Sequence, residues 1–423
     1  MKHILLTITL FTSAFAFAQH GLDKDIANIE NKVIEWRRDF HQNPELSNRE
    51  YRTAEKIAAH LKSLGIEVQT GVAHTGVVGI LKGKKPGKVI ALRADMDALP
   101  VPERADLPFK STAKGEYNGE EVPVMHACGH DTHIAILMGV AEIMSKNTDK
   151  IKGTIKFIFQ PAEEGAPSGE EGGAELMVKE GVLKNPDVDA VFGLHIGSGQ
   201  PVNTIAYKSG GMMAAVNSFE INVKGKQSHG STPWTSIDPI IASVKIIDGL
   251  QTLVSREMPL TTEAVVLTIG KIESGVRSNI IPESANMLGT LRTLDADMQT
   301  TIIQRMKEMV PAIAKAYRAE ATINVDKGYP ITYNDPELTA QMLPSLQEVA
   351  GVKSVFEIKP ITGAEDFSFF QKEVPGFFFF LGGMTPGETE AFPHHTPDFY
   401  IDESGMLLGV KAFIQLSLDY LNN

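Results

Sequence analysis

Cysteine is nearly absent from the sequence. Cys128 is the only one in 423 residues, so no disulfide can form within the chain. A chain of this length buries enough apolar surface to fold without such cross-links. A lone thiol is a hazard in an oxidising compartment unless it is buried or bound to a metal ion. If the protein is exported, this scarcity favours a metal-ligand role for Cys128.

Positive charge is also in short supply. Lys and Arg total 40 against 52 Asp and Glu, a formal net charge of −12, and no basic stripe occurs. Nucleic acid is therefore not expected as a partner. Low-complexity tracts and internal repeats are missing too, and 43% hydrophobic with 22% charged residues is typical of a soluble globular protein. The length favours two domains.

A long apolar run begins the chain. Lys2 and His3 precede the run Ile4–Phe17, and Ala16–Ala18 forms a small-x-small cleavage site before Gln19. This pattern predicts a secretory signal peptide, residues 1–18, that is too short for a membrane anchor. A buried N-terminal helix is the alternative. We expect a periplasmic or secreted protein without a membrane partner after cleavage.

The segment Met125–His133, MHACGHDTH, concentrates one cysteine and three histidines in nine residues. Apolar residues recur at helical spacing after it, so a helix over 133–146 with one buried face is expected. Imidazole and thiolate are good ligands for zinc-like ions, and Cys128 and His130 could reach one ion from a loop. The alternative is a polar turn with a buried thiol, capped by Asp131.

Strands and helices alternate along the chain on both sides of a central segment, 209–330. Such alternation predicts an α/β fold with a mostly parallel sheet covered by helices. Strands are expected at Val77–Leu81, Val89–Ala94, Gly153–Gln160, Asp189–Ile196 and Pro375–Leu381, and helices within 25–64 and at 133–146, Gly173–Glu180, Pro336–Val349 and Gly405–Leu421.

Residues able to do chemistry follow these strands. They are Asp95 and Asp97, Glu163 and Glu164, His195, and the loop residues His394 and His395. Ligands of parallel sheets bind beyond the carboxyl ends of the strands, where all of these residues are expected. Each has an ordinary alternative: a helix-capping aspartate, a solvated glutamate pair, a core histidine or plain loop residues. Their joint placement favours one site.

The central segment, 209–330, has a different order of elements. Strands at Ala215–Val223, Ala264–Ile272, Ile280–Leu291 and Ala321–Val325 and helices at Asp238–Arg256 and Ala296–Arg318 give a β-α-β-β-α-β order. That order predicts a ferredoxin-like domain. It would be inserted into a main domain formed by 19–208 and 331–423.

Cysteine, histidine and carboxylate candidates outnumber the four ligands of one ion, which suggests two ions. Two adjacent glutamates, Glu163 and Glu164, fit a division of labour in which one binds metal and its neighbour takes a proton from water. A hydrolase with Cys128 as nucleophile is the rival mechanism. It leaves Glu163, Glu164, His195 and His395 without a role.

Several motifs resemble those of the dinuclear-metal aminoacylase/carboxypeptidase family, from about Ile29 to the C-terminus. They are MHACGHDTH, FQPAEEG, the strand-end LH, GKQSHGSTP, RSNIIP and HHTPDF. The match is narrower with the amidohydrolase branch, which includes hippurate hydrolases, auxin-conjugate hydrolases and N-acetyldiaminopimelate deacetylases. Outside this branch, relatives have a ligand histidine where this chain has Asp95.

The resemblance implies a role for each candidate. Glu163 would be the general base and Asp97 the acid that orients a metal ligand. His229 would be a lid histidine that reaches the substrate from the partner subunit, while Asn279 and Arg292 would hold the substrate carboxylate; a strand-edge Asn and a surface Arg are the alternatives. The ligands of two divalent ions (manganese, zinc, cobalt or nickel) would be Cys128, His130, Glu164, His195 and His395.

We therefore predict an exported metal-dependent amidohydrolase that cleaves N-acyl-L-amino acids, such as N-acetyl or benzoyl conjugates. The inserted domain would act as a lid and join two chains in a homodimer. One alternative is a metallo-dipeptidase or carboxypeptidase acting on short peptides. Another is a non-catalytic periplasmic protein that binds peptides or metal.

Overall fold

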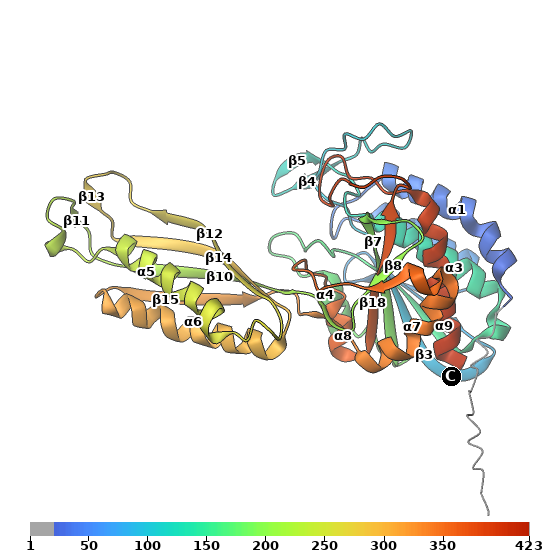
Figure 1. The fold of residues 1–423 in the computed structure, drawn as a ribbon. Helices are drawn as coiled ribbons and strands as arrows, with labels where there is room; N and C mark the ends of the chain where they lie inside the picture. The colour runs from blue at the N-terminus through green and yellow to red at the C-terminus, as the bar shows by residue number, and fades with distance from the viewer. Residues whose placement is uncertain (1–20, 423) are drawn as a thin grey trace, which may run out of the picture.

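The computed structural model describes residues 21–422, so the predicted signal peptide, residues 1–18, lies outside the described residues. The chain forms a large body and an elongated smaller one beside it (Figure 1). Within residues 21–422, no helix combines the length and apolar character needed to cross a bilayer.

An eight-stranded sheet forms the centre of the large body. Its four central strands, β6, β3, β7 and β18, run parallel to one another, and antiparallel strands flank them on both sides. The predicted α/β fold with a mostly parallel central sheet is thus confirmed. In spatial order the strands are β1 (Glu67–Val72), β2 (Gly76–Lys82), β6 (Lys152–Gln160), β3 (Lys85–Asp95), β7 (Ala190–Pro201), β18 (Gly376–Met384), β8 (Ile205–Tyr207) and β17 (Val355–Glu357).

Helices cover both faces of this sheet (Figure 1). Because the central strands are buried on both sides, β18 is apolar without alternation, and its Phe377, Phe378 and Phe379 are fully buried. One face is covered by α1 (Asp23–Gln42), α2 (Tyr51–Ser63), α3 (His130–Lys146), α7 (Pro336–Ala350) and α9 (Met406–Asn422), and the other by α4 (Gly173–Lys179) and α8 (Ser368–Glu373).

The smaller body contains a four-stranded antiparallel sheet with the strand order of a ferredoxin-like unit. Helices α5 (Pro239–Thr252) and α6 (Ala296–Ala316) cover one of its faces. In spatial order the strands are β12 (Val265–Ser274), β14 (Ser284–Thr293), β10 (Ala215–Lys224) and β15 (Glu320–Lys327). The short strands β11 (Ser228–His229) and β13 (Ile280–Ile281) pair at the end farthest from the large body (Figure 1).

Two short strand pairs lie outside both main sheets. The pair β9 (Gly210–Met213) and β16 (Thr332–Asn334) lies where the chain leaves and re-enters the large body. The hairpin of β4 (Lys114–Tyr117) and β5 (Glu120–Pro123) projects from the large body (Figure 1). The sequence analysis predicted neither pair, because the segments are short and lack a run of apolar residues.

Several predicted boundaries were wrong: β3 begins at Lys85 rather than Val89, and β7 ends at Pro201 rather than Ile196. The single strand expected over Ile280–Leu291 is divided around Pro282, whose nitrogen has no hydrogen to donate to a strand ladder. Helix α3 begins at His130, three residues earlier than predicted, so His130 and His133 lie in its first turn. Asp238 caps α5 from outside, since its side chain accepts hydrogen bonds from the Ile240 and Ile241 amides.

Candidate metal centre

Polar side chains gather at the carboxyl ends of the central parallel strands. β3 ends at Asp95, β6 leads through Gln160 to Glu163 and Glu164, and β7 carries His195. The loop between β5 and α3 adds Cys128, and the segment after β18 adds His395. Loops that are distant in sequence therefore converge at the edge where α/β sheets bind their ligands.

The Cys128 sulfur lies at the centre of this cluster. Its Sγ is 3.4 Å from His195 Nε2 and 3.3 Å from His395 Nε2. Two groups with the spacing of metal ligands share this sulfur: one with His195 and His394, the other with His130 and Glu164. Glu164 also lies 3.2 Å from His395 Nε2 through its Oε1. The Cys128 thiol therefore belongs to both of these groups.

Two histidines present a free nitrogen to the cluster. His130 Nδ1 donates to the Asp97 carbonyl oxygen at 2.9 Å, and His195 Nδ1 donates to the Ile196 carbonyl oxygen at 2.7 Å. Because a carbonyl only accepts, Nδ1 carries a proton in both rings, which leaves Nε2 as the nitrogen available to a metal ion. The buried His130 Nε2 has no hydrogen-bond partner in the protein. Such an unpaired buried nitrogen is what a metal ligand requires.

Two other nearby histidines have both ring nitrogens engaged. His133 donates from Nδ1 to Asp95 at 2.5 Å and accepts from the Ile196 amide at Nε2, 2.8 Å away. His394 accepts from the Ser198 amide at 3.2 Å and faces the Cys128 carbonyl oxygen with Nδ1, also at 3.2 Å. They therefore position other groups. Asp95 is likewise occupied, since it also binds Arg93 at 2.7 Å.

The cluster attracts positive charge. Burial opposes protonation of His130, but the charges of Asp95 and Asp97 outweigh it and raise the pKa of His130 to about 10. Burial, followed by the charges of Glu164 and Glu163, raises the pKa of the Cys128 thiol well above its usual range. A thiol among carboxylates is poorly suited to act as a nucleophile. A divalent cation would displace the proton from His130 and stabilise the thiolate.

Two buried carboxylates hold the turn that carries Glu163 and Glu164. Asp97 accepts from the amides of Glu163 and Glu164 at 3.1 and 3.0 Å, and Glu50 accepts from the Ala162 amide at 2.9 Å. Ala162 has a φ of +51°, a left-handed conformation that costs a non-glycine residue energy. The turn is thus fixed by hydrogen bonds from distant parts of the chain.

Glu163 is buried beside the cluster, with its Oε2 3.9 Å from His130 Nε2. One carboxylate oxygen from each of Glu163, Glu365 and Asp366 lies within 4.8 Å of the other two. The buried Arg93 forms ion pairs with Glu365 and Asp366 at 2.8 and 2.9 Å. Burial, then the charges of Glu365 and Glu164, raise the pKa of Glu163 well above its usual range. A carboxylate in this environment accepts a proton readily.

The sequence analysis missed Arg93, Glu365, Asp366 and Glu50. A charged residue inside an apolar strand, as Arg93 is in β3, was the available signal for the first. For Glu365, Asp366 and Glu50, no local pattern distinguishes a buried carboxylate from a solvated one.

The structure does not bring the other predicted substrate-binding residues to this cluster within one chain. His229 lies exposed on β11 at the far tip of the smaller body (Figure 1). Asn279 is exposed beside it, with its carbonyl oxygen accepting from the Gly230 amide at 2.8 Å. Arg292 lies near the opposite end of β14, paired across the sheet with Val216 and Val266.

The chain is similar to known proteins over most of its length. Residues 91–419 match the family model described as Peptidase family M20/M25/M40. "Thermostable carboxypeptidase 2" of Saccharolobus solfataricus is 42% identical over 403 residues, which cover 95% of this chain and 98% of that protein. "N-acetylcysteine deacetylase" of Bacillus subtilis is 38% identical over 391 residues, with 92% and 96% covered. A solved structure from Bacillus subtilis, a dinuclear metal-binding peptidase of the M20 family, matches with a TM-score of 0.78 at 34% identity and covers 94% of this chain and 99% of its own.

Proposed function

Since the chain belongs to peptidase family M20/M25/M40, we propose that it cleaves the amide bond of N-acyl-L-amino acids, releasing a carboxylic acid and a free amino acid. Family membership confirms the resemblance seen in the sequence. The protein is a metal-dependent hydrolase that acts on amide bonds. Support for N-acyl substrates comes from similarity to a deacetylase and to a plant hydrolase named "IAA-amino acid hydrolase ILR1-like 2", 34% identical over 440 residues.

One observation carries the proposal: metal-ligand atoms converge beside a buried carboxyl group, Glu163, that belongs to neither of the two groups sharing the Cys128 sulfur. The residues proposed to hold two divalent ions are Cys128, His130, Glu164, His195 and His395, the last of which contacts both Cys128 and Glu164. The ions, when bound, would polarise the scissile carbonyl and make water more acidic. Manganese, zinc, cobalt and nickel all suit a mixed thiolate, imidazole and carboxylate set.

The remaining steps belong to the protein's own side chains. Glu163 takes the proton from the attacking water and delivers it to the departing amine nitrogen. Asp97 holds the Glu163 and Glu164 amides and lies 3.3 Å from His130 Nδ1, so it fixes the base and one ligand together. A role as a non-catalytic binding protein would leave Glu163 without a use.

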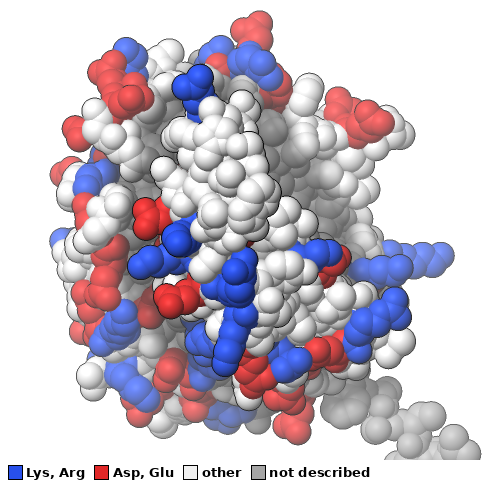
Figure 2. Space-filling view, turned by 90° about the vertical axis from the view of Figure 1, so that its left-hand side faces the viewer, with Lys and Arg blue, Asp and Glu red and all other residues white. Residues whose placement is uncertain are grey.

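His229 is proposed to serve the partner subunit of a homodimer. In one chain it lies exposed at a tip that also exposes Trp234 and Val276, with 74% and 93% of their surfaces accessible. Figure 2 looks at this end of the molecule, where an uncharged area lies between charged side chains. A tip of this kind is suited to dock against another surface. There His229 would donate to the carbonyl oxygen as negative charge develops on it.

The edge of the four-stranded sheet offers a place to join two chains. β12 is an outer strand of that sheet, and its side chains Val266 and Ile272 are exposed. Unpaired strand edges readily pair with another copy, and a twofold axis would place each tip toward the other chain. Light scattering should then give a mass near twice that of the chain, and a single-chain mass would exclude this arrangement.

A carboxypeptidase acting on short peptides is the second candidate. It is favoured by similarity to the thermostable carboxypeptidase, whose sequence identity with this chain is 42%, against 38% for the deacetylase. Both candidates need a substrate carboxylate to be held, the role proposed for Asn279 and Arg292, because a planar guanidinium can bind a carboxylate with two hydrogen bonds.

Hydrolysis of a substrate panel separates these candidates. N-acetyl, N-benzoyl and N-succinyl amino acids would be compared with unblocked dipeptides sharing the same C-terminal amino acid, using protein refilled with each metal after chelation. We expect the N-acyl amino acids to have the higher kcat/KM. A clear preference for the dipeptides would replace the proposed function with the second candidate.

Export is proposed from the N-terminal pattern. The mature protein would be periplasmic or secreted, would begin at Gln19, and would have neither nucleic acid nor a membrane as partner. Intact-mass measurement on protein from the native cell envelope tests this, since retention of Met1 in a cytoplasmic fraction would contradict it.

A further inference from the structure

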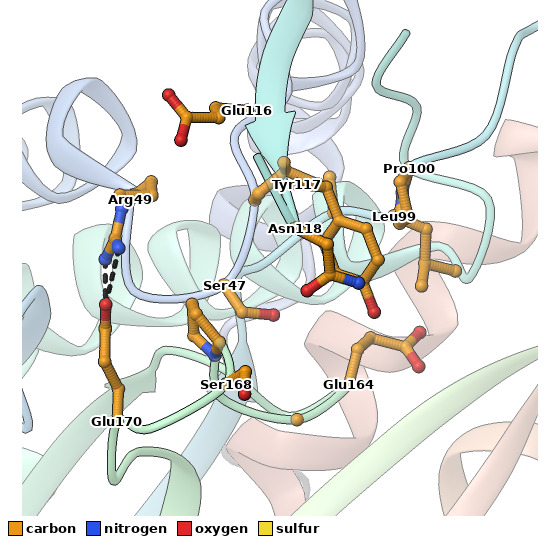
Figure 3. A pocket seen from close by; sticks show the side chains of 14 residues that line it. Ser47, Arg49, Leu99, Pro100, Glu116, Tyr117, Asn118, Glu164, Ser168 and Glu170 are labelled. Carbon is orange, nitrogen blue, oxygen red and sulfur yellow. Dashed lines mark hydrogen bonds and ion pairs between the residues drawn. The ribbon is translucent and has the colours of Figure 1, made fainter. Parts of the chain in front are cut away.

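A pocket of about 260 Å³ opens beside Glu164 on the large body. It is lined by Leu46, Ser47, Leu99 and Pro100, and by Tyr117 at the tip of the β4–β5 hairpin. In the view of Figure 3 the Tyr117 ring lies beside Leu99 and above Glu164. A substrate whose carbonyl lies at the metal centre would place one of its two halves here.

The hairpin is built to hold Tyr117 in this position. Asn118 and Gly119 have φ angles of 53° and 82°, the conformation of a tight two-residue turn, so Tyr117 stands at the hairpin tip. Gly115 lies so close to Leu46 that an added Cβ would approach its Cδ1 to 2.9 Å. The hairpin therefore packs closely on Leu46, which itself lines the pocket.

Charge decides which half of the substrate enters. Arg49 is the only cation among the residues lining this pocket, and it is already bound to Glu170, with its NH2 group 2.6 Å from Oε1 (Figure 3). Glu116 adds a further negative charge to the lining. A substrate carboxylate would thus meet no free positive charge, whereas an uncharged acyl group would lose nothing by entering.

We propose that this pocket binds the acyl group and that Tyr117 selects planar, uncharged acyl groups. The inference rests on the proposed function. Ligand pockets for larger molecules begin at about 300 Å³, so the space suits a single ring and leaves an acetyl group poorly surrounded. The Tyr117 ring and the Leu99 side chain supply the flat apolar surfaces that a ring packs against.

Three substrates with the same amino acid test this assignment: N-benzoyl, N-acetyl and N-succinyl. In the wild type we expect N-benzoyl to have the highest kcat/KM, and N-succinyl, whose acyl group carries a carboxylate, to be at least about tenfold worse than N-acetyl. Tyr117→Ala should lower kcat/KM for N-benzoyl roughly three- to tenfold, through KM, the contribution of one ring contact. N-acetyl should change less than about twofold, because it does not reach the ring.

Two variants serve as controls. Tyr117→Phe keeps the ring and should behave as the wild type. Tyr333→Ala removes a similarly exposed tyrosine, 49% against 46%, from β16, away from this pocket, and should change neither substrate. Equal losses on N-benzoyl and N-acetyl in Tyr117→Ala, or a preference for N-succinyl, would overturn the assignment. A wild type inactive on all three substrates would instead refute the proposed function.

A second observation carries an independent inference, concerning Glu50. This residue is fully buried between α1 and α2, where its Oε1 accepts from the Ala162 amide at 2.9 Å and its Oε2 from the Thr75 hydroxyl at 2.5 Å. Ala162 immediately precedes Glu163 and has the left-handed φ noted above. We infer that Glu50 is a positioning residue, which holds this strained turn and thereby the direction of the Glu163 carboxylate.

Glu50→Ala and Glu45→Ala form a matched pair for this inference. Glu45 also binds backbone amides, those of Arg52 and Thr53 at 3.0 and 2.8 Å, but it caps α2 and has no contact with the Glu163 turn. Glu50→Ala should lower kcat by about ten- to a hundredfold, the scale of a reacting group displaced by about 1 Å, with KM and metal content unchanged. Glu45→Ala should lower the melting temperature and leave kcat unchanged.

Conservative variants keep the test decisive if Glu50→Ala does not fold. Glu50→Gln retains an oxygen that accepts from the Ala162 amide and should recover most of kcat. Glu50→Asp keeps the charge but withdraws the carboxylate by one methylene group, so kcat should fall. Glu50 would have only a structural role if Glu50→Asp lost no more kcat than Glu50→Gln does. The same would follow if Glu45→Ala lost as much kcat as Glu50→Ala does.

Discussion

In the large body, the side chains proposed for chemistry are mostly buried and held by hydrogen bonds from several elements, whereas His229 and Asn279 of the smaller body lie exposed at its tip. Glu163 and His130 have 6% and 0% of their surfaces exposed. His229 is exposed, and its Nδ1 contacts only its own loop, through Ser231. The large body therefore holds a cluster whose side chains already contact one another, whereas His229 has no contact with that cluster within residues 21–422.

The two sheets show the same difference. The central strands of the large body are buried on both faces, so a charged side chain on them needs partners there. Arg93 on β3, for example, forms ion pairs with Glu365 and Asp366. β10 of the smaller body alternates buried Phe219, Ile221 and Val223 with exposed residues, because helices cover only one face. The large body is organised to fix charges, and the smaller one to present a surface.

Metal removal should have the largest effect and should be confined to the large body. A chelator is expected to abolish hydrolysis, with activity returning when a divalent metal is added. Cys128→Asp keeps an anionic ligand but has no thiol nucleophile, so it should retain measurable activity. These measurements need metal analysis beside steady-state kinetics, and full activity in metal-free protein would exclude the proposed chemistry.

Loss of the exposed histidine should have the next largest effect. His229→Ala is expected to keep metal content and folding but to lower kcat by about a hundredfold or more, the scale of one lost oxyanion donor. Mixing His229→Ala with Glu163→Gln protein should restore part of the activity, because one site of the mixed dimer would have both an intact base and an intact lid histidine. Absence of rescue, in a mixture shown to exchange subunits, would mean that His229 acts in its own chain or not at all.

A glycine pair in the smaller body should give the smallest effect. A Cβ at Gly289 would lie 2.1 Å from the Phe219 ring, so Gly289→Ala should destabilise this sheet by about 1–3 kcal/mol. Gly270→Ala is the matched control, since no atom lies within 4 Å of its Cβ. Metal content should be unchanged in both variants. Thermal unfolding that is equally altered by the two substitutions would contradict this packing.

Periodicity along the chain predicted most of the fold. The alternation around Phe219, Ile221 and Val223 predicts a strand buried on one face. The apolar runs of β18 and of β6, which Lys156 interrupts, predict strands buried on both faces. The β4–β5 hairpin was missed because its residues are polar and mostly exposed. Its Asn118-Gly119 turn was a usable signal.

The candidate site was predicted as a set of residue types, without its hydrogen bonds. Cys128 and His130 are close in sequence, so their spacing indicates a site. Glu50 binds the amide of Ala162, 112 residues away, and Arg93 binds Glu365, 272 residues away. Contacts of that range depend on how strands are ordered in the sheet, which no local pattern specifies.

Metal content measured together with kcat in two adjacent variants tests the central claim most directly. The account predicts that Glu163→Gln keeps its metal ions and loses roughly two to four orders of magnitude in kcat, the share of a general base. Glu164→Gln, in contrast, should lose metal, because its carboxylate lies among the ligands. Metal loss in Glu163→Gln with metal retained in Glu164→Gln would contradict the account by reversing the two roles.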